Sequence, residues 1–322
     1  MLLELVEYHW AEDIDDVLLL LGRHDVKTVP LAGGTHLLGL QDTTIEAVVD
    51  LRDLGLAYVT EDAAGMHIGA MTTLQSMVDA SLLKEFATGV LSHAAHASSS
   101  SRLIRNSATL GGTISTGIAA QADLLTALAA LDAKVVVRSG SRTQVDLRGG
   151  TYERPGLALS GVVFKGKQER QVNYIDYPVE RRANELIVEV IIPPLATHYG
   201  ASITRIARTP TDVALLNAVA LVEIEHGMYK RVRLTLGGVN MDPVRLYAVE
   251  RQLEGQKVVH PINSQKLLSI LHTGMSTFRP ANDIRVSSGY RRVSGMSLAY
   301  RALEEAMNVA YWHSMVTSEK GL

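Results

Sequence analysis

Two glycine pairs are the residues of this chain whose type and spacing could do chemistry: Ala32-Gly33-Gly34-Thr35 and Leu110-Gly111-Gly112-Thr113. A diphosphate is bound by several backbone N–H groups that converge on it. Glycine permits this because it tolerates positive φ and carries no Cβ to block the approach. Two such turns could hold one diphosphate from opposite sides. Taken singly, each pair is better explained as a structural turn.

The spacing around both pairs excludes the two commonest nucleotide motifs. Neither pair has the G-x-G-x-x-G spacing of a dinucleotide-binding fold, and neither ends in the Lys-Ser/Thr of a phosphate-binding P-loop. A nucleotide site on these turns must therefore belong to another architecture.

Three other groups of residues could carry chemistry, and each has a simpler interpretation. His93 and His96 could share a helix face as metal ligands, but no cysteine or spaced acid completes a site, which favours ordinary surface or core histidines. The serines 98–101 lack the context of a nucleophile elbow. The cluster Tyr290-Arg291-Arg292 could contact a partner chain or a cofactor, but a solvated helix face is the expected interpretation.

The first half of the chain predicts two small α+β units. Asp13 is a good helix N-cap and Gly22 a good stop, so residues 13–22 are expected to be helical. With strands near 28–31 and 47–51 they form a β-α-β-β unit that ends near residue 57. The second unit is expected to contain a strand at 66–70, a cap at Thr72/Thr73, a helix at 84–97, a helix at 123–131 capped by Asp123, and a strand at 133–138.

The second half predicts a boundary and a further domain. Residues 139–183 are polar and irregular, and the strand 186–192 stops at Pro193-Pro194, so a domain boundary is expected near 195. Beyond it we expect a hairpin of 213–225 and 229–239, a helix from Asp242-Pro243 to Gly255, and a final helix over 288–315.

Composition narrows the class of protein. The 322 residues are 47% hydrophobic and 20% charged, which is typical of a globular protein of two or three domains. The net charge of -3 with scattered basic residues disfavours nucleic acid. There is no cysteine, which excludes disulfides, zinc-thiolate sites and any iron–sulfur cluster held by this chain. The acidic N-terminus makes a poor signal peptide and no apolar run is long enough to span a bilayer, so a cytoplasmic location is expected.

The motifs, taken in order, resemble a known family. They are Leu31-Ala32-Gly33-Gly34-Thr35, Ile68-Gly69-Ala70-Met71-Thr72-Thr73, Ile104-Arg105-Asn106-Ser107-Ala108-Thr109-Leu110-Gly111-Gly112, Ala122-Asp123-Leu124, Glu185-Leu186-Ile187-Val188, Pro193-Pro194, Asp283-Ile284-Arg285 and Gly289-Tyr290-Arg291-Arg292. Across nearly its whole length the chain resembles the medium, FAD-binding subunit of molybdenum hydroxylases, the family of xanthine dehydrogenase and aerobic carbon monoxide dehydrogenase.

The resemblance implies an α+β fold with a two-subdomain FAD-binding domain of the PCMH type, similar to vanillyl-alcohol oxidase. It would comprise residues 1–57 and 58–195, followed by an α+β C-terminal domain of the carbon monoxide dehydrogenase flavoprotein type at 196–322. The implied cofactor is FAD. Its implied contacts are Leu31, Ala32, Gly33, Gly34, Thr35 and His36 on the first turn, Thr109, Leu110, Gly111, Gly112 and Thr113 on the second, and Asp123, Ile187 and Thr204. Asp123 would lie on the ribose or adenine side, and Ile187 and Thr204 near the flavin ring.

The implied function is electron transfer within a larger oxidoreductase. FAD would pass electrons from a 2Fe–2S small subunit to a final acceptor, while a molybdopterin-binding large subunit oxidises the substrate, in a dimer of heterotrimers. No catalytic side chain or metal ligand is expected in this chain.

Two alternatives remain open at this point. One is a scaffold subunit with weakened or lost FAD, because the second motif ends in Thr113 where the family usually has Asn, and the segment 114–122 lacks the family's Ser-Pro. The other is a stand-alone flavin oxidase, which would need an acid or base on the substrate side. The stretch 151–183 is also longer than in typical relatives.

Overall fold

The N-terminal unit is a small parallel sheet with one helix. The computed structural model describes residues 5–118, 121–144, 162–182, 184–238, 241–276 and 278–320. The unit contains β1 (Glu7–Trp10), α1 (Ile14–Leu21), β2 (Thr28–Leu31), the 3-10 turn η1 (Leu37–Gly39) and β3 (Ala47–Asp50), with strand order β1-β3-β2. Asp13 caps α1 by accepting a hydrogen bond from the backbone N–H of Asp16, as its position predicted.

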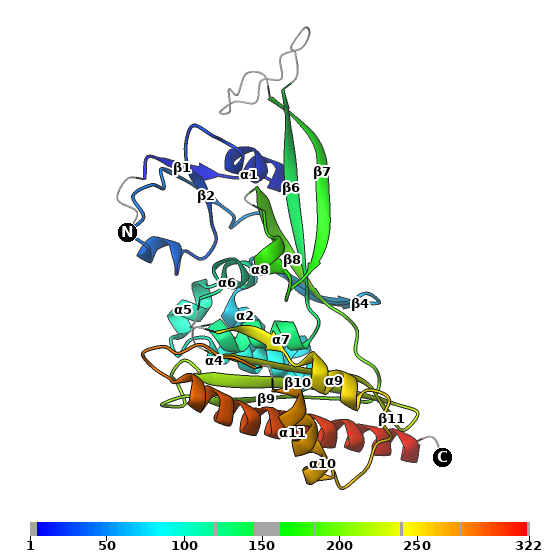
Figure 1. Ribbon diagram of the computed structural model, residues 1–322. Coiled ribbons are helices and arrows are strands. Elements are labelled where there is room, and N and C mark those ends of the chain that lie inside the picture. Colours follow the sequence, from blue (N-terminus) through cyan, green and yellow to red (C-terminus); the bar gives the residue numbers. More distant parts are fainter. Residues whose placement is uncertain are drawn as a thin grey trace.

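The central unit is a five-stranded antiparallel sheet with a group of helices (Figure 1). Its elements are β4 (Val59–Asp62), β5 (Gly65–Gly69), α2 (Leu74–Asp79), α3 (Ser81–Glu85), η2 (Phe86–Gly89), α4 (Val90–Ala97), α5 (Arg102–Ser107), α6 (Leu110–Thr116), α7 (Ala122–Ala130), β6 (Lys134–Gln144), β7 (Val162–Asn173), α8 (Tyr177–Glu180) and β8 (Glu185–Ile192). The strand order is β4-β5-β8-β6-β7, and β6 and β7 form a long hairpin that projects from the body in Figure 1.

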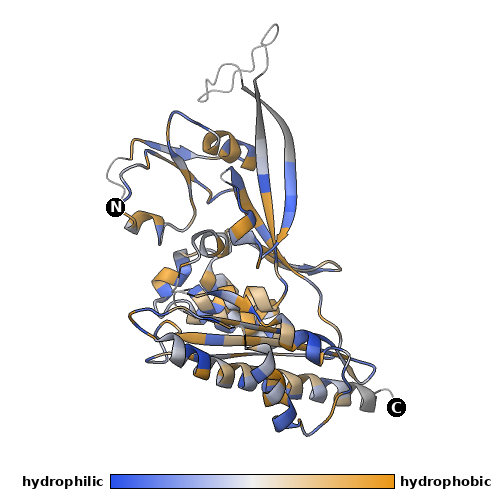
Figure 2. Cartoon of the chain, in the orientation of Figure 1, coloured by the Kyte–Doolittle hydropathy of each residue, from blue (hydrophilic) through white to orange (hydrophobic). Residues whose placement is uncertain are grey.

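An apolar cluster joins the first two units. Val17, Leu18 and Leu20 of α1 pack with Leu186 and Val188 of β8 in one buried core. Figure 2 colours most of α1 as hydrophobic. The loops that follow the strands of the N-terminal unit are therefore held against the central unit.

The C-terminal domain is a four-stranded antiparallel sheet that lies between two helices. It contains β9 (Tyr199–Ile206), β10 (Leu216–Glu225), β11 (Met228–Gly238), β12 (Met241–Arg245), α9 (Tyr247–Leu253), α10 (Ser264–Gly274) and α11 (Ser288–Lys320), with order β12-β11-β10-β9. The long helix α11 packs on β9 and β10, while α7 of the central unit lies on the other side of the sheet (Figure 1). The central unit and the C-terminal domain therefore share α7 as a packing surface.

Four local predictions are wrong. The helix expected at 84–97 is interrupted, because Ala87, Thr88 and Gly89 have φ of 48°, 54° and 76°. Asp123 does not cap α7, whose N-cap is Gln121.

Residues 139–144 and 162–173 belong to strands, although 139–183 were expected to be irregular. Residues 241–245 form β12 where a helix was expected; β12 is an edge strand, where Pro243 is tolerated because its missing N–H faces no neighbour.

Candidate functional site

Residues from both glycine motifs meet around a small cavity. The cavity has a volume of about 70 Å³ and lies between the N-terminal and central units. Ala32 of the first turn, Gly111 and Gly112 of the second, and Ile187 of β8 all line it. The other lining residues are Pro30, Leu51, Ala70, Met71, Ser115, Tyr177, Glu185 and Leu186. The structure thus brings four of the predicted site residues together.

The first turn needs its glycines for two different reasons. A Cβ on Gly33 would lie 1.6 Å from the carbonyl oxygen of Ser107, so the turn rests directly on the backbone that leads into the second motif. Gly34 has φ of 70°, in the left-handed region that favours glycine. The two motifs are therefore in backbone contact.

The backbone N–H groups of the first turn are available for a ligand. Within the described ranges, none of the amides of residues 32–36 donates a hydrogen bond to a protein acceptor. Successive backbone N–H groups in a turn can form an anion-binding concavity when they point to one place. The first turn therefore has backbone donors that no protein acceptor among the described residues uses.

The second motif is the first turn of a helix, not a free loop. Its amides are already used: the N–H of Leu110 donates to Thr72 O at 3.0 Å, that of Gly111 to Ala70 O at 2.8 Å, and that of Gly112 to the cap hydroxyl of Thr109 at 3.1 Å. A Cβ on Gly112 would contact only this hydroxyl, at 3.0 Å. This motif therefore offers a ligand a backbone surface without side chains, rather than free N–H donors.

Thr113 does not face the cavity. Its side chain is buried and its hydroxyl donates to the carbonyl of Thr109 at 2.9 Å. The hydroxyl is thus engaged within its own helix in this structure.

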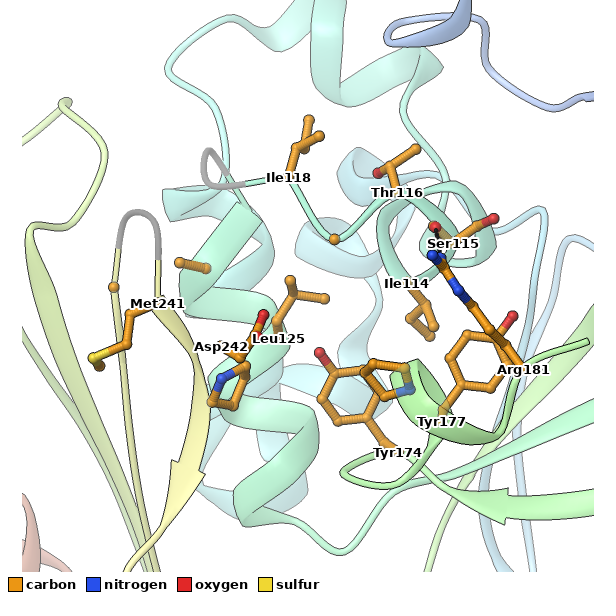
Figure 3. A pocket seen from close by; sticks show the side chains of 15 residues that line it. Ile114, Ser115, Thr116, Ile118, Leu125, Tyr174, Tyr177, Arg181, Met241 and Asp242 are labelled. Atoms are coloured by element: carbon orange, nitrogen blue, oxygen red, sulfur yellow. Dashed lines mark hydrogen bonds between the residues drawn. The ribbon is translucent and has the colours of Figure 1, made fainter. Parts of the chain in front are cut away.

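A larger cavity of about 300 Å³ adjoins the small one and shares Ser115 and Tyr177 with it (Figure 3). It is lined by the end of α6, by α7, by α8 and the residues before it, and by the start of β12. The side chains labelled in Figure 3 are Ile114, Ser115, Thr116, Ile118, Leu125, Tyr174, Tyr177, Arg181, Met241 and Asp242. Together the two cavities extend from the first glycine turn to the C-terminal domain.

The larger cavity combines aromatic rings with polar groups. Burial raises the pKa of Tyr174 and of Tyr177, so both phenols stay protonated and can donate hydrogen bonds. Arg181 donates to the carbonyl of Ser115 at 3.2 Å, which places a guanidinium near the junction of the cavities. Asp242 is the one carboxylate among the described lining residues. Such a lining suits a ligand with ribose hydroxyls, an aromatic base and phosphate.

An ion pair fixes the wall of the small cavity beside Ile187. Arg170 donates to both carboxylate oxygens of Glu185, at 2.7 and 2.9 Å. Hydrogen bonds from Arg170 hold the pKa of Glu185 below its usual value. This bidentate pair keeps the start of β8 in place.

Asp123 and Thr204 lie away from both cavities. Asp123 is buried; its carboxylate accepts a hydrogen bond from Asn217 at 2.7 Å and lies 3.3 Å from Arg205. Thr204 is on β9, and its hydroxyl donates to the carbonyl of Leu298 at 3.1 Å. Neither residue is brought to the first glycine turn.

The remaining candidates have structural surroundings. His93 and His96 are exposed on α4, and the described residues contain no group of His, Cys, Asp or Glu able to hold a metal. Ser101 caps α5 by accepting a hydrogen bond from the backbone N–H of Ile104. Arg291 is fully buried and pairs with Asp283 at 2.6 Å, so the solvated helix face expected for it is wrong.

Sequence reasoning missed the aromatic part of the site. Tyr174, Tyr177 and Arg181 fall in the stretch expected to be irregular. The two tyrosines stand three positions apart, before and at the start of α8, and this pair of aromatic residues is the signal that could have found them.

Comparison with known proteins assigns the chain to a family. Residues 4–195 match the FAD binding domain in molybdopterin dehydrogenase, and residues 201–306 match the CO dehydrogenase flavoprotein C-terminal domain. The chain belongs to this FAD-binding family. Its resemblance, its fold and its cofactor FAD, all expected from the sequence, are confirmed, and the chain is an oxidoreductase subunit.

Several relatives of this FAD-binding chain match it over nearly their full length. The glyceraldehyde dehydrogenase medium chain of Sulfolobus acidocaldarius is 28% identical over 302 residues, covering 92% of this chain and 97% of the relative. The carbon monoxide dehydrogenase medium chain of Afipia carboxidovorans is 26% identical over 306 residues, covering 93% and 96%.

Solved structures show the same fold. A chain of carbon monoxide dehydrogenase from Hydrogenophaga pseudoflava has a TM-score of 0.75 at 21% identity, covering 96% of this chain and 98% of its own. A chain of quinoline 2-oxidoreductase from Pseudomonas putida 86 has a TM-score of 0.74 at 22% identity, covering 95% and 98%. Within the described ranges, no helix is both long and apolar enough to cross a membrane.

Proposed function

We propose that FAD lies across the two adjoining cavities, with its diphosphate on the amides of residues 32–36. The unpaired amides of the first turn carry this proposal, because a diphosphate needs several backbone N–H donors and these amides have no protein acceptor in the part of the chain that the structure describes. The flavin ring would lie against Ile187, and the adenosine part would extend toward Tyr174 and Arg181. Asp123 and Thr204 are not part of the site we propose.

The two motifs would then have different tasks. The first turn donates hydrogen bonds, and the surface of Gly112, which lacks a Cβ, lets the cofactor approach α6. Sites for small ligands usually have about 300–1,000 Å³. The small cavity, at about 70 Å³, must therefore widen when a ring enters.

The function we propose is electron transfer between partner chains. Bound FAD supplies the redox chemistry, since it accepts electrons singly and releases them in pairs. The protein binds and orients the ring and shields it from water. The absence of cysteine means that an iron–sulfur donor would sit in another chain. Relatives named as medium chains support an assembly with a small iron–sulfur and a large molybdopterin subunit, which we propose forms a dimer of heterotrimers in the cytoplasm.

Purification of the tagged full-length chain from its own cells tests this function. We expect it to bring down a cysteine-rich small chain and a molybdopterin-containing large chain, and anaerobic addition of reductant to the complex should bleach the flavin absorbance. A folded, flavin-bound chain that purifies alone from the source cells would contradict the electron-transfer role. A complete complex without flavin would instead favour the scaffold alternative, which the family match does not favour.

A further inference from the structure

A buried polar cluster ties α7 to the C-terminal sheet. The side chain of Asn217, on β10, is fully buried; it donates to Asp123 at 2.7 Å and lies 2.9 Å from the hydroxyl of Thr126. Asp123 and Thr126 both belong to α7, in the FAD-binding domain. One amide of the C-terminal domain thus contacts two side chains on the neighbouring domain's helix.

The backbone of β11 packs closely against the side chains of this cluster. A Cβ on Gly237 of β11 would lie 1.8 Å from the hydroxyl oxygen of Thr126 and 2.7 Å from the side-chain oxygen of Asn217. The backbone of β11 therefore closes the cluster from the side, and the position of α7 relative to the sheet is determined at this point.

The cluster also contains one ion pair, between the buried carboxylate of Asp123 and the half-buried guanidinium of Arg205. Arg205 lies 3.3 Å from Asp123 and donates as well to the carbonyls of Pro210 and Asp212. Burial raises the pKa of Asp123, so its carboxylate depends on the donors around it. Removing the donor on Asn217 would leave a buried acceptor with one partner fewer.

The other side of α7 lines the proposed cofactor site. Ala122 and Leu125 face the cavity of about 300 Å³, while Asp123 and Thr126 face the C-terminal sheet. We propose that Asn217 is a positioning residue for FAD. Through Asp123 and Thr126 it holds α7 in place, and α7 forms part of the wall of the larger cavity. This inference rests on the proposed location of FAD, and it assigns to the C-terminal domain a part in cofactor retention.

Exchanging the side chains of Asn217 and Asp123 tests the role of Asn217. Asn217→Asp places two carboxylates in contact, and we expect FAD affinity, measured by quenching of flavin fluorescence, to fall about tenfold, the equivalent of one lost hydrogen bond. The double variant Asp123→Asn with Asn217→Asp restores one amide and one carboxylate, so its affinity should return to within about threefold of wild type. Asn263→Asp, the same change at the exposed cap of α10, is the matched control and should leave affinity unchanged.

A pH series separates positioning from general damage. Protonation of one carboxyl in Asn217→Asp restores a donor, so its FAD affinity should improve between about pH 8 and about pH 6, whereas the exchanged double variant should show no such gain. Should Asn217→Asp fail to fold by circular dichroism, Thr126→Val removes only the hydroxyl, and it should weaken FAD about threefold or more.

Three results are decisive. Unchanged affinity in Asn217→Asp, or in Thr126→Val where the first variant does not fold, overturns the positioning role. Loss of FAD in the exchanged variant with its fold intact would also overturn it, and would place the Asp123 carboxylate on the cofactor. A wild-type chain that is folded and binds no FAD would refute the proposed function itself. The fluorescence titration of the wild-type chain shows this result separately from those of the variants.

Discussion

At the first glycine turn, Gly33 and Gly34 lack side chains for different reasons, and a mutation at either would change more than phosphate binding. Gly33 is pressed against the Ser107 carbonyl and Gly34 has positive φ, so a larger residue at either position disturbs the fold as well. Gly112 is different, because a Cβ there meets only the Thr109 hydroxyl. It is therefore the residue at which cofactor binding can be tested with the least damage to the fold.

Gly112→Ala is expected to weaken FAD binding about tenfold while stability changes by no more than about 1 kcal/mol, since alanine favours the helix by about that amount. Fluorescence titration and thermal unfolding measure the two effects. Gly111→Ala is the comparison: its Cβ would lie 2.9 Å from that of Ala70, so it should lower stability by about 1–3 kcal/mol. Equal FAD affinity in Gly112→Ala and wild type would argue against the proposed cavity.

The ion pair of Glu185 and Arg170 should make stability depend on pH. The pKa of Glu185 is lowered in the folded chain from 4.5, so the pair stabilises the fold above about pH 4.5 and this contribution is lost as pH falls through the folded pKa. Glu185→Gln should cost about 1–2 kcal/mol near pH 7 and progressively less below pH 4.5, measured by urea unfolding. A difference between the two proteins that does not shrink in acid would contradict the assignment.

Residue types alone predicted the glycine turns and their order, but not which amides are free. The N–H groups of Leu110 and Gly111 are bonded to Thr72 and Ala70, which reach them only through the folding of another segment. Asp123 shows the same limit, because its partners Asn217 and Arg205 lie in the other domain.

Among the secondary-structure elements, α11 shows how a single close approach fixes a layer. A Cβ on Gly200 of β9 would lie 2.1 Å from the carbonyl oxygen of Ala306 and 2.5 Å from the N of Ala310. The helix therefore lies directly on the strand at this point. The sequence predicted a final helix over 288–315, where α11 lies, and it predicted β10 and β11 as a hairpin. It was wrong about β12, an edge strand where a helix was expected to start at Asp242-Pro243.

Gly200→Ala should lower the free energy of unfolding by about 1–3 kcal/mol, because strand and helix must separate. Gly289→Ala lies in the first turn of the same helix, where a Cβ would have nothing within 4 Å, and it should leave stability equal or slightly higher. Guanidinium unfolding of both variants checks this, and equal stability in the two would contradict the close packing of α11.

In the whole molecule, the FAD-binding and C-terminal domains are joined by polar groups as well as by packing. Asp132, two residues after the end of α7, accepts from Arg233 at 2.7 Å and from Arg245 at 2.8 Å, both on the C-terminal sheet. Composition alone predicted that this chain holds no iron–sulfur cluster. The contacts between domains could not be predicted, because they join residues far apart in the sequence.

Asp132→Asn should weaken this junction by on the order of 1 kcal/mol while keeping a residue that tolerates its φ of 53°. Differential scanning calorimetry should show that the variant unfolds at a lower temperature, or over a wider range, than wild type. Added salt should lower the transition temperature of wild type more than that of the variant, because salt screens the ion pairs. Asp176→Asn, an acid on the same side of the central unit that forms no ion pair in the described ranges, is the control. Identical transitions in Asp132→Asn and wild type would show that packing alone joins the domains.

A crystal structure of the full chain grown with FAD tests the two-turn site most directly. We predict that the diphosphate oxygens accept hydrogen bonds from backbone amides within residues 32–36, that Gly112 lies against the cofactor, and that the ring contacts Ile187. A diphosphate bound elsewhere, with no hydrogen bond from the amides of residues 32–36, would contradict the site proposed for this chain.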